Sequence, residues 1–535
     1  MKKLLALLLV LALAVSLAAC GKPGLTQSGD GGAVAEEDRY GGHVDYVFSF
    51  KPANLDPAKS TGLWAYVFTS MIYEAPLTRD AEGNIRPNVC DFELSDDQLT
   101  LKLWVRDGVT FHDGSAVEIE DVIASIRRSV HKSPREFVAP YIKDVVIDDD
   151  GVATITFTEY NEKTMYYIAC VNPFIGVMPK EIAEKYSYES KNYITNVEDA
   201  IGTGPYKVTE LIAEVSVSME RYDGYKPVEE GYTGFAAPKK AYIDSFTFYY
   251  DTDTSASNIG MLNGDYDLRA GAGSEIKGQF EAAGLVMYTK LSNTGDMINF
   301  NTYEDTIIGR SADMRKAMIA AIDWVEYFGV GGTVVDGKGV NPALDSKYAT
   351  DVFAKAPYFV TDGTNVETSK KYQEAAGYNG EEIKLVINSG LVQEITALSG
   401  YWKAAGINIS IQTMESAAFT EYYGEKSNVW GLRYQWPSLN NSPTLLSGTI
   451  MTDTYSTPEK DKLYGELSTM IAGSDEYMAK WEELAQQMVD DCAVVFMKQT
   501  KLTWWSHPDM VFEYDGLSPY LFNAYWRNPS EHGVK

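Results

Sequence analysis

The most diagnostic segment of the chain reads Leu101-Lys102-Leu103-Trp104-Val105-Arg106-Asp107-Gly108-Val109-Thr110-Phe111-His112-Asp113-Gly114. Its first half alternates apolar residues at 101, 103 and 105 with Lys102 and Trp104, which is typical of a strand with one buried face. The two Asp-Gly pairs then suit tight turns on either side of a short strand. The segment therefore predicts a strand, a turn and a second short strand in close succession.

A helix is predicted directly after this segment. Ser115 should cap its first turn, and Glu118 three residues later should complete a capping box. Apolar residues recur at helical spacing and predict a buried face: Ile119, Val122, Ile123 and Ile126. Acidic residues gather near the start of this helix and two arginines near its end, as the helix dipole favours.

A β-α-β unit is predicted farther along the chain. Residues 383–387 alternate as a strand, a helical segment runs to about Ala405, and residues 407–411 alternate again. Gly406 suits the C-terminal cap of the helix. Because a connecting helix returns the chain to the same edge of the sheet, the two strands should be parallel. Helices with one apolar face are also predicted at 314–322 and 475–490.

The N-terminus predicts export and lipid attachment. Lys2 and Lys3 precede an apolar run from Leu4 to Val15, which is shorter than the ~20 residues that span a bilayer. Leu17-Ala18-Ala19-Cys20 then resembles the bacterial lipobox. We expect residues 1–19 to be a signal peptide, Cys20 to be lipidated, and 20–40 to form a flexible tether. The alternative is an ordinary secretory signal with a chance cysteine.

The composition bounds the class of protein. The chain has 535 residues and a formal charge of −29. Removing residues 1–19 leaves 516 residues (535 − 19), enough for two or three domains of ~100–200 residues each. Because a strongly acidic chain is repelled by nucleic acids and anionic membrane surfaces, we expect neither surface as a partner.

Cysteine usage gives little sign of a disulfide framework. With Cys20 lipidated, Cys90, Cys170 and Cys492 remain, and an odd number cannot all pair. Cys90 and Cys170 either pair or stay as buried free thiols, and we expect free thiols. The five histidines are scattered, without the spacing of a metal site.

The sequence contains partial matches to phosphate-binding and calcium-binding motifs, but each lacks residues that its function requires. Residues 332–338 fit the start of a phosphate-binding loop, but Gly339 replaces the hydroxyl residue that holds magnesium. Residues 251–262 begin like a calcium loop and lack its glycine and its final glutamate. The common hydrolase signatures are absent. We therefore expect a protein that is not an enzyme, with no catalytic residue, no cofactor and no metal site.

Several short motifs resemble one protein family. The segment 105–114, followed by Asp121-Val122 and Arg128, resembles the signature of oligopeptide- and dipeptide-type extracellular solute-binding proteins. Further matches follow in the order of that family: Asn54-Leu55-Asp56-Pro57, Tyr73-Glu74, Ile201-Gly202-Thr203-Gly204-Pro205-Tyr206, Arg221-Tyr222-Asp223-Gly224-Tyr225, Leu262-Asn263-Gly264-Asp265-Tyr266-Asp267, Asn299-Phe300-Asn301-Thr302 and Met314-Arg315-Lys316-Ala317. Gly202 and Gly204 are interpreted as residues with backbone angles closed to other side chains.

The resemblance implies an α/β fold of the periplasmic-binding-protein type, with two lobes, a hinge and an additional small domain. The chain would cross between the lobes near Phe300 and near Gln499, and ligand would close the lobes. The expected parts are lobe I at 41–78, 200–297 and 500–535, the small domain at 79–199 and lobe II at 298–499.

The resemblance also indicates where ligand binds. Peptide-binding members carry Arg-x-x-Trp-x-x-Asp and a proline four residues later, and Arg433, Trp436 and Pro443 fit this pattern. Leu439 stands where the family's aspartate holds a peptide's α-ammonium group, and leucine cannot compensate a buried charge. The predicted ligand-binding residues are Glu74, Arg433, Tyr434, Trp436, Leu439 and Asn440. Structural alternatives remain: Trp436 packing the lobe, Arg433 pairing with an internal acid, and Glu74 lying solvated at the surface.

By resemblance, the predicted function is that of a lipid-anchored receptor for an ATP-driven importer, binding peptides or a related small organic solute. Expected partners are that ligand, the importer's membrane permease and the membrane itself, reached through the lipid, and we expect a monomer on the outer face of the cytoplasmic membrane. Four alternatives stay open: a receptor of this fold for a metal chelate or sugar, a surface enzyme, a receptor for peptide signals, and a surface chaperone.

Overall fold

The structure is a computed structural model. It describes residues 26–27, 34–48, 54–59, 65–81, 83–131, 136–169, 175–187, 189–190, 192–251, 253–271, 275–303, 306–329, 348, 350–389, 392–415, 432–435, 444, 455–514 and 519–534. The chain forms two compact units, each built from separate segments. Unit 1 comprises 1–156, 166–288 and 503–535, and unit 2 comprises 157–165 and 289–502.

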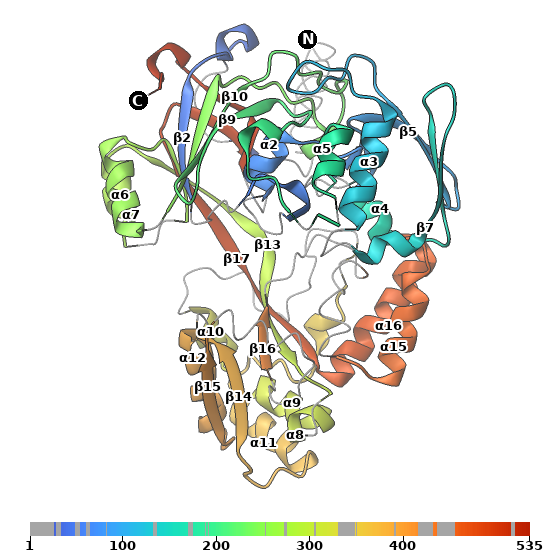
Figure 1. Ribbon diagram of the computed structural model, residues 1–535. Helices are drawn as coiled ribbons and strands as arrows, with labels where there is room; N and C mark the ends of the chain where they lie inside the picture. Colours follow the sequence, from blue (N-terminus) through green and yellow to red (C-terminus); the bar gives the residue numbers. More distant parts are fainter. Residues whose placement is uncertain are drawn as a thin grey trace, which may run out of the picture. The chain divides into compact units, whose positions relative to one another are not determined.

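The strands that unit 1 contributes to the main sheet have the order β17-β12-β2-β11-β10-β9, and the sheet continues beyond β17 (Figure 1). These strands are β2 (His43–Phe48), β9 (Tyr206–Ile212), β10 (Ser216–Arg221), β11 (Ser245–Tyr250), β12 (Leu268–Ala270) and the end of β17 (Val494–Ser506). β2 pairs in parallel with both β11 and β12. Every residue of β2 is buried, which is typical of a parallel strand covered on both faces.

A second sheet of unit 1 contains the segment quoted first. Its order is β5-β6-β8-β7, with β5 (Cys90–Leu94), β6 (Thr100–Val105), β7 (Ile142–Ile147) and β8 (Ala153–Phe157). Leu101 and Leu103 are fully buried in β6, whereas Trp104 is 36% exposed, so the predicted half-buried strand is confirmed. Gly108 and Gly114 both have positive φ, as the predicted Asp-Gly turns require.

The helix after this segment starts later than predicted. α3 (Ile119–Val130) is capped by Glu118, whose capping-box partner is Asp121, so the prediction of Ser115 as cap was wrong. Ser115 is engaged elsewhere, because its backbone N–H and its hydroxyl both donate to Asp113 Oδ1. Its neighbour Ala116 also pairs with Thr110 in an isolated β-bridge. The predicted apolar face of α3 is buried, as expected.

Unit 2 contains the predicted β-α-β unit. β14 (Ile383–Asn388) pairs in parallel with β15 (Ile409–Met414), and α12 (Val392–Ala404) connects them. Gly406 follows the helix with φ +86°, which confirms its place at the C-terminal cap. One hydrophobic core fills the unit around the indoles of Trp402 and Trp481, which donate to the carbonyls of Met318 and Tyr348.

The two predicted helices with one apolar face also lie in unit 2. α9 (Ala312–Ala320) buries Met314, Ala317 and Met318. α16 (Asp475–Asp491) is capped by the Ser474 hydroxyl and buries its apolar face, with Trp481, Leu484 and Met488 on it. α11 (Asn365–Ala375) packs on α9, and α15 (Pro458–Ser468) packs on α16 (Figure 1).

Two long strands carry the chain across the unit boundary. β13 (Val286–Phe300) contains the boundary at 288/289, and β17 contains the boundary at 502/503. The sequence predicts crossings near Phe300 and Gln499. Residues 79–156 and 166–199 fall within unit 1, so a separate small domain at 79–199 stays a prediction.

The remaining elements are short. They are β1 (Thr26–Gln27), β3 (Leu77–Arg79), β4 (Ile85–Pro87), β16 (Leu432–Gln435), β18 (Met510–Tyr514), β19 (Pro519–Trp526), α2 (Ser70–Ile72), α4 (Glu162–Ile168), α5 (Lys180–Lys185), α6 (Thr254–Asn263), α7 (Lys277–Ala282), α8 (Ile307–Arg310) and α10 (Trp324–Gly329). Among the described residues, no helix combines the length and the apolar character needed to cross a bilayer. The thiols of Cys90 and Cys492 are free and buried, as expected, and Cys170 lies outside the described residues.

Candidate ligand-binding site

Four of the family-like motifs of the sequence come together in unit 1, around His112. The His112 backbone N–H donates to Gly202 O (3.1 Å), and the Gly202 N–H donates to His112 Nδ1 (3.2 Å). His112 Nε2 lies 3.0 Å from Gly204 O, so the ring is a neutral tautomer with its proton on Nε2. Burial is the main cause that lowers the pKa of His112 to about 4.

The two glycines of this region are needed for a reason that the sequence did not indicate. Neither Gly202 nor Gly204 has positive φ, so the interpretation by backbone angle was wrong. They allow close approach instead: a Cβ on Gly202 would lie 2.1 Å from Ile72 O, and one on Gly204 would lie 2.4 Å from Met71 O. The Gly204 N–H donates to Ile72 O at 2.9 Å. The loop that contains Gly202 and Gly204 therefore packs directly against the backbone of α2, the helix that precedes Tyr73-Glu74.

Glu74 is held in the interior of unit 1. Its side chain is 1% exposed, and its Oε1 lies 2.5 Å from Lys239 Nζ and accepts a hydrogen bond from the Tyr225 hydroxyl (3.0 Å). Burial, and after it the charge of Glu74, raise the pKa of Tyr225 well above its usual value, so its hydroxyl stays protonated. A surface position for Glu74 is therefore wrong, and its carboxylate has a structural partner. A contact with ligand stays a prediction.

Arg106 and Thr110 connect the segment at 105–114 to the motif at 221–225. Its guanidinium donates to the carbonyls of Asn88, Lys226 and Pro227, and Thr110 Oγ1 lies 2.8 Å from the hydroxyl of Tyr222. The motif at 221–225 therefore packs on the segment at 105–114. These motifs form a rigid frame around Glu74 rather than a set of free reactive groups.

The predicted ligand segment begins at the end of β16 in unit 2. β16 pairs antiparallel with β13, with Arg433 opposite Asn299 and Gln435 opposite Met297. Because β13 runs from unit 1 into unit 2, the antiparallel β16 runs back toward the point where β13 enters unit 2. The chain leaves β16 at Gln435, at that end, and continues into residues 436–443.

Most of the predicted site residues cannot be placed further. The structure describes the backbone of Arg433 and Tyr434 in β16 and not their side chains. Trp436, Leu439 and Asn440 lie outside the described residues, as does Cys20. Their roles as ligand-binding and lipidated residues stay predictions.

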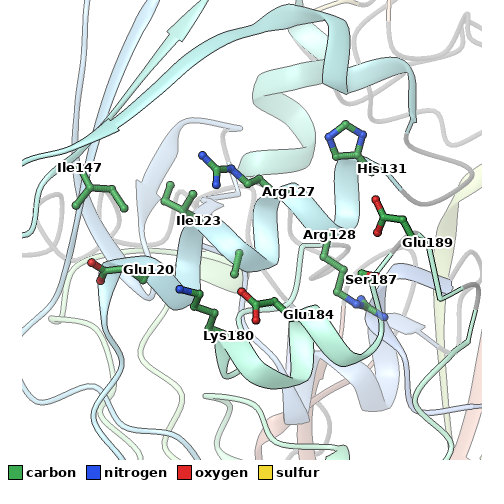
Figure 2. A pocket seen from close by; sticks show the side chains of 11 residues that line it. Glu120, Ile123, Arg127, Arg128, His131, Ile147, Lys180, Glu184, Ser187 and Glu189 are labelled. Atoms are coloured by element: carbon green, nitrogen blue, oxygen red, sulfur yellow. The ribbon is translucent and has the colours of Figure 1, made fainter.

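A cavity of about 250 Å³ lies between α3 and α5 in unit 1 (Figure 2). Three carboxylates, Glu120, Glu184 and Glu189, line it together with three cations, Arg127, Arg128 and Lys180. Arg128 is already bonded to the buried Asp56. With the Arg128 charge compensated by Asp56, three carboxylates and two cations remain along the lining, so the cavity carries little excess charge. It includes none of the residues predicted to bind ligand.

The fold also gathers a histidine cluster that the sequence did not indicate. His507, Asp509 and His532 lie within reach of one another in unit 1, although the histidines look scattered along the chain. The only signal in the sequence is the close spacing of His507 and Asp509. His532 follows after two further strands, so its place could not be predicted from spacing.

The fold is similar to the folds of solved substrate-binding proteins. The structure resembles the ABC transporter substrate-binding protein CtaP of Listeria monocytogenes, with a TM-score of 0.72, 18% identity, and 91% of this chain and 100% of the other covered. It also resembles the periplasmic EDTA-binding protein EppA, with a TM-score of 0.74, 18% identity, and coverages of 93% and 97%.

Sequence comparison defines the family. Residues 84–452 match the sequence model described as "Bacterial extracellular solute-binding proteins, family 5 Middle". The chain belongs to this family. A probable peptide ABC transporter periplasmic-binding protein of Sinorhizobium fredii is 22% identical over 490 residues, covering 85% of each chain. The expected family and fold class are thereby confirmed.

Proposed function

We propose that this protein is the substrate receptor of an ATP-driven importer and captures a peptide or a related small organic solute. The match of residues 84–452 to the extracellular solute-binding family carries this proposal. The similarity in fold to the ABC transporter substrate-binding protein CtaP, over 91% of this chain, supports it. The ligand would bind between two lobes, close them, and leave unchanged to the permease.

Identification of the natural ligand tests this function. The mature protein is purified from its own host under mild conditions and denatured, and the released small molecules are identified by mass spectrometry. We expect one class of intact solute. The same solute, added back to ligand-free protein, should lower the radius of gyration in small-angle scattering. Recovery of a cleaved or otherwise modified form of an added solute would contradict the proposal and indicate an enzyme.

A second candidate ligand class is favoured by one residue. Leu439 replaces the aspartate that anchors the α-ammonium group of peptides in similar proteins, while Arg433, Trp436 and Pro443 keep the register of that motif. A cleft without this carboxylate suits uncharged or N-blocked peptides, or a non-peptide solute such as a metal chelate. EppA, which is similar in fold, binds EDTA.

Calorimetry on matched peptides separates these ligand classes. We expect N-acetylated peptides to bind at least as tightly as the same peptides with a free amine, because position 439 has no carboxylate to form an ion pair with the α-ammonium group. The variant Leu439→Asp should shift the preference toward free amines. Removing one partner of a buried ion pair costs about 3–5 kcal/mol. If another acid formed such a pair with the amine, acetylation would therefore weaken binding by a measurable amount. Tight binding of free peptides with a large loss on acetylation would mean that Glu74 or another acid holds the amine.

A further inference from the structure

We propose that His507, Asp509 and His532 form a binding site for one divalent transition-metal ion of the zinc type. Two imidazoles and a carboxylate are ligands that Zn²⁺, Ni²⁺ and Cu²⁺ accept readily, whereas Mg²⁺ and Ca²⁺ prefer oxygen alone. Three protein ligands leave a fourth position of a tetrahedral ion for water. The site lies wholly in unit 1 and shares no residue with the predicted ligand segment.

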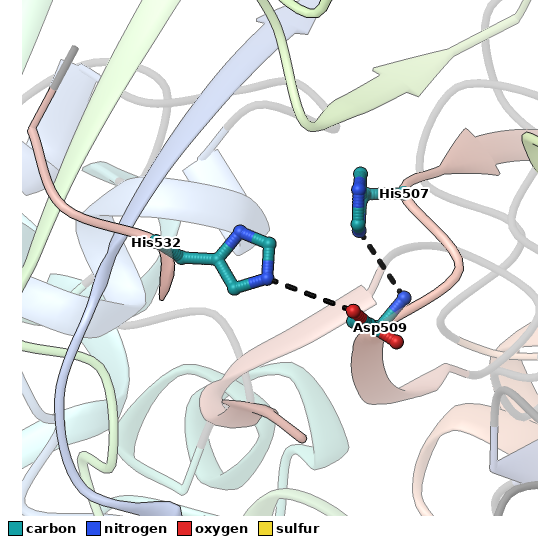
Figure 3. Close-up of side chains that lie close together, drawn as sticks. All are labelled: His507, Asp509 and His532. Carbon is teal, nitrogen blue, oxygen red and sulfur yellow. Dashed lines mark hydrogen bonds and ion pairs between the residues drawn. The ribbon is translucent and has the colours of Figure 1, made fainter. Parts of the chain in front are cut away.

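Figure 3 shows His532 directed at the Asp509 carboxylate and His507 joined to the Asp509 backbone N–H. One donor atom from each of the three side chains lies within 4.8 Å of the other two. His532 Nε2 is 3.9 Å from Asp509 Oδ2. Two ligands of a tetrahedral zinc ion lie about 3.4 Å apart, given metal–ligand bonds of ~2.0–2.2 Å. Small side-chain rotations therefore bring all three donors onto one ion.

The hydrogen bonds of the two imidazoles differ, and one imidazole nitrogen is left without a partner. His507 Nδ1 accepts a bond from the Asp509 backbone N–H at 3.2 Å, so a metal ion bound at Nδ1 would replace this bond. His532 Nε2 is buried and has no hydrogen-bond partner. A buried polar atom of this kind is costly unless something binds it.

The surrounding fold holds the three residues in place. The His507 backbone N–H is bonded to Asp267 O just after β17, and the β18–β19 hairpin returns the chain with Trp526 opposite Met510. The His532 ring stacks on Trp526, with ring centroids 3.7 Å apart and 8° between the planes. The His532 carbonyl accepts from the His43 N–H at 2.7 Å. The two imidazoles are thus held close to Asp509 without a metal, and a bound ion would join the segment 529–532 to the turn before β18.

Metal titration of the full-length mature protein tests this site. The protein is made without a histidine tag and is stripped of metal on a chelating resin, because a soluble chelator could occupy the solute site of this fold. Isothermal titration with Zn²⁺ should show one equivalent bound. Asp509→Asn and His532→Ala should each weaken binding at least tenfold. His131→Ala, at an exposed histidine outside the cluster, should leave it unchanged.

A second measurement guards against misfolding of the variants. Asp509→Asn keeps the size of the side chain, and its melting temperature without metal should match that of the wild type. Added Zn²⁺ should raise the melting temperature of the wild type and slow removal of the last residues by a serine carboxypeptidase, and should do neither in Asp509→Asn. Absence of Zn²⁺ binding in the wild type, or equal binding in the wild type, Asp509→Asn and His532→Ala, would overturn the proposal.

Discussion

At the scale of single residues, His112 shows how a chemically active side chain can serve the scaffold alone. Its two ring nitrogens are used in opposite senses, Nδ1 as an acceptor from Gly202 and Nε2 as a donor to Gly204. A protonated ring would carry a hydrogen on Nδ1 and could no longer accept. The folded state therefore favours the neutral ring.

This preference predicts a stability that depends on pH. The pKa of His112 is about 4 in the folded protein and 6.5 without the fold. Above pH 6.5 both states hold a neutral ring, so the contribution is fully present. As the pH falls toward 4, the His112 ring is protonated in the unfolded state and stays largely neutral in the folded state. The free energy of unfolding therefore falls by at most about 3 kcal/mol.

Denaturant unfolding at a series of pH values measures this effect. His112→Asn keeps an acceptor for Gly202 and cannot titrate, so it should be less stable at pH 7 and should lose less stability between pH 7 and pH 4 than the wild type. The control His131→Ala alters an exposed histidine and should keep the full pH dependence. Equal pH dependence in His112→Asn and the wild type would assign the effect to other groups.

The buried pair of Asp56 and Arg128 gives a second prediction at this scale. Arg128 Nη2 lies 2.5 Å from Asp56 Oδ2, and the side chains are 1% and 0% exposed. Removing one partner leaves an uncompensated charge, so Asp56→Asn or Arg128→Met should cost about 3–5 kcal/mol of unfolding free energy. The double variant Asp56→Leu/Arg128→Met should cost less than the sum of the single changes. Arg127→Met, at the exposed neighbouring position, should change stability by less than about 0.5 kcal/mol in the same denaturation assay.

At the scale of elements, the loop at 201–206 depends on close contact with α2. Gly202→Ala should destabilise unit 1 by about 1–3 kcal/mol or more, because its new Cβ would meet a carbonyl oxygen and the backbone would have to move. Gly278→Ala is the matched control in the short helix α7. No atom lies within 4 Å of its new Cβ, so we expect it to be neutral or stabilising by up to about 1 kcal/mol. Thermal unfolding of both variants compares them, and a harmless Gly202→Ala would refute the close-contact explanation.

Sequence patterns predicted those elements whose formation is decided locally. The β14-α12-β15 unit and the apolar faces of α9 and α16 follow from periodicity within one segment, and the structure confirms them. The start of α3 was wrong because a competing local bond decided it: Ser115 bonds to Asp113, which leaves Glu118 to cap the helix. The start of a helix is therefore hard to predict from sequence where the candidate capping residue can also bond to another neighbour.

The candidate site could be predicted only in part, because distant segments build it. The resemblance indicated the motifs around His112, Gly202 and Glu74, but their mutual bonds depend on the fold of unit 1. The ion pair of Glu74 with Lys239 joins residues 165 positions apart. His532 joins His507 only after β18 and β19 have turned the chain back. The residues expected to touch ligand in 436–440 lie outside the described residues, so the amine-anchor hypothesis rests on the sequence.

At the scale of the whole molecule, the proposed lipid anchor is tested by one change. Cys20→Ala removes the thiol that lipid would modify, so the protein should either leave the membrane fraction or keep its signal peptide. Cell fractionation, with the mass of the intact protein, measures both outcomes. Cys90→Ala is the control, because its thiol is buried and free in the fold. A Cys20→Ala protein with the membrane association and mass of the wild type, apart from the side-chain change, would exclude lipidation at this position.

The discontinuous make-up of unit 1 has a consequence for the order in which the chain can be assembled. The part of β17 that pairs with β12 and the β18–β19 hairpin come from the last segment, and 214 residues of unit 2, 289–502, are made before it. At ~5–20 residues per second, β12 waits roughly 10 to 40 s for its partner on a translating ribosome. Meanwhile its backbone amides and carbonyls form an open edge, the kind of surface on which strands of other chains can pair. The nascent chain is thus most exposed to misassembly at β12, and a holding chaperone acting during this interval would protect it there.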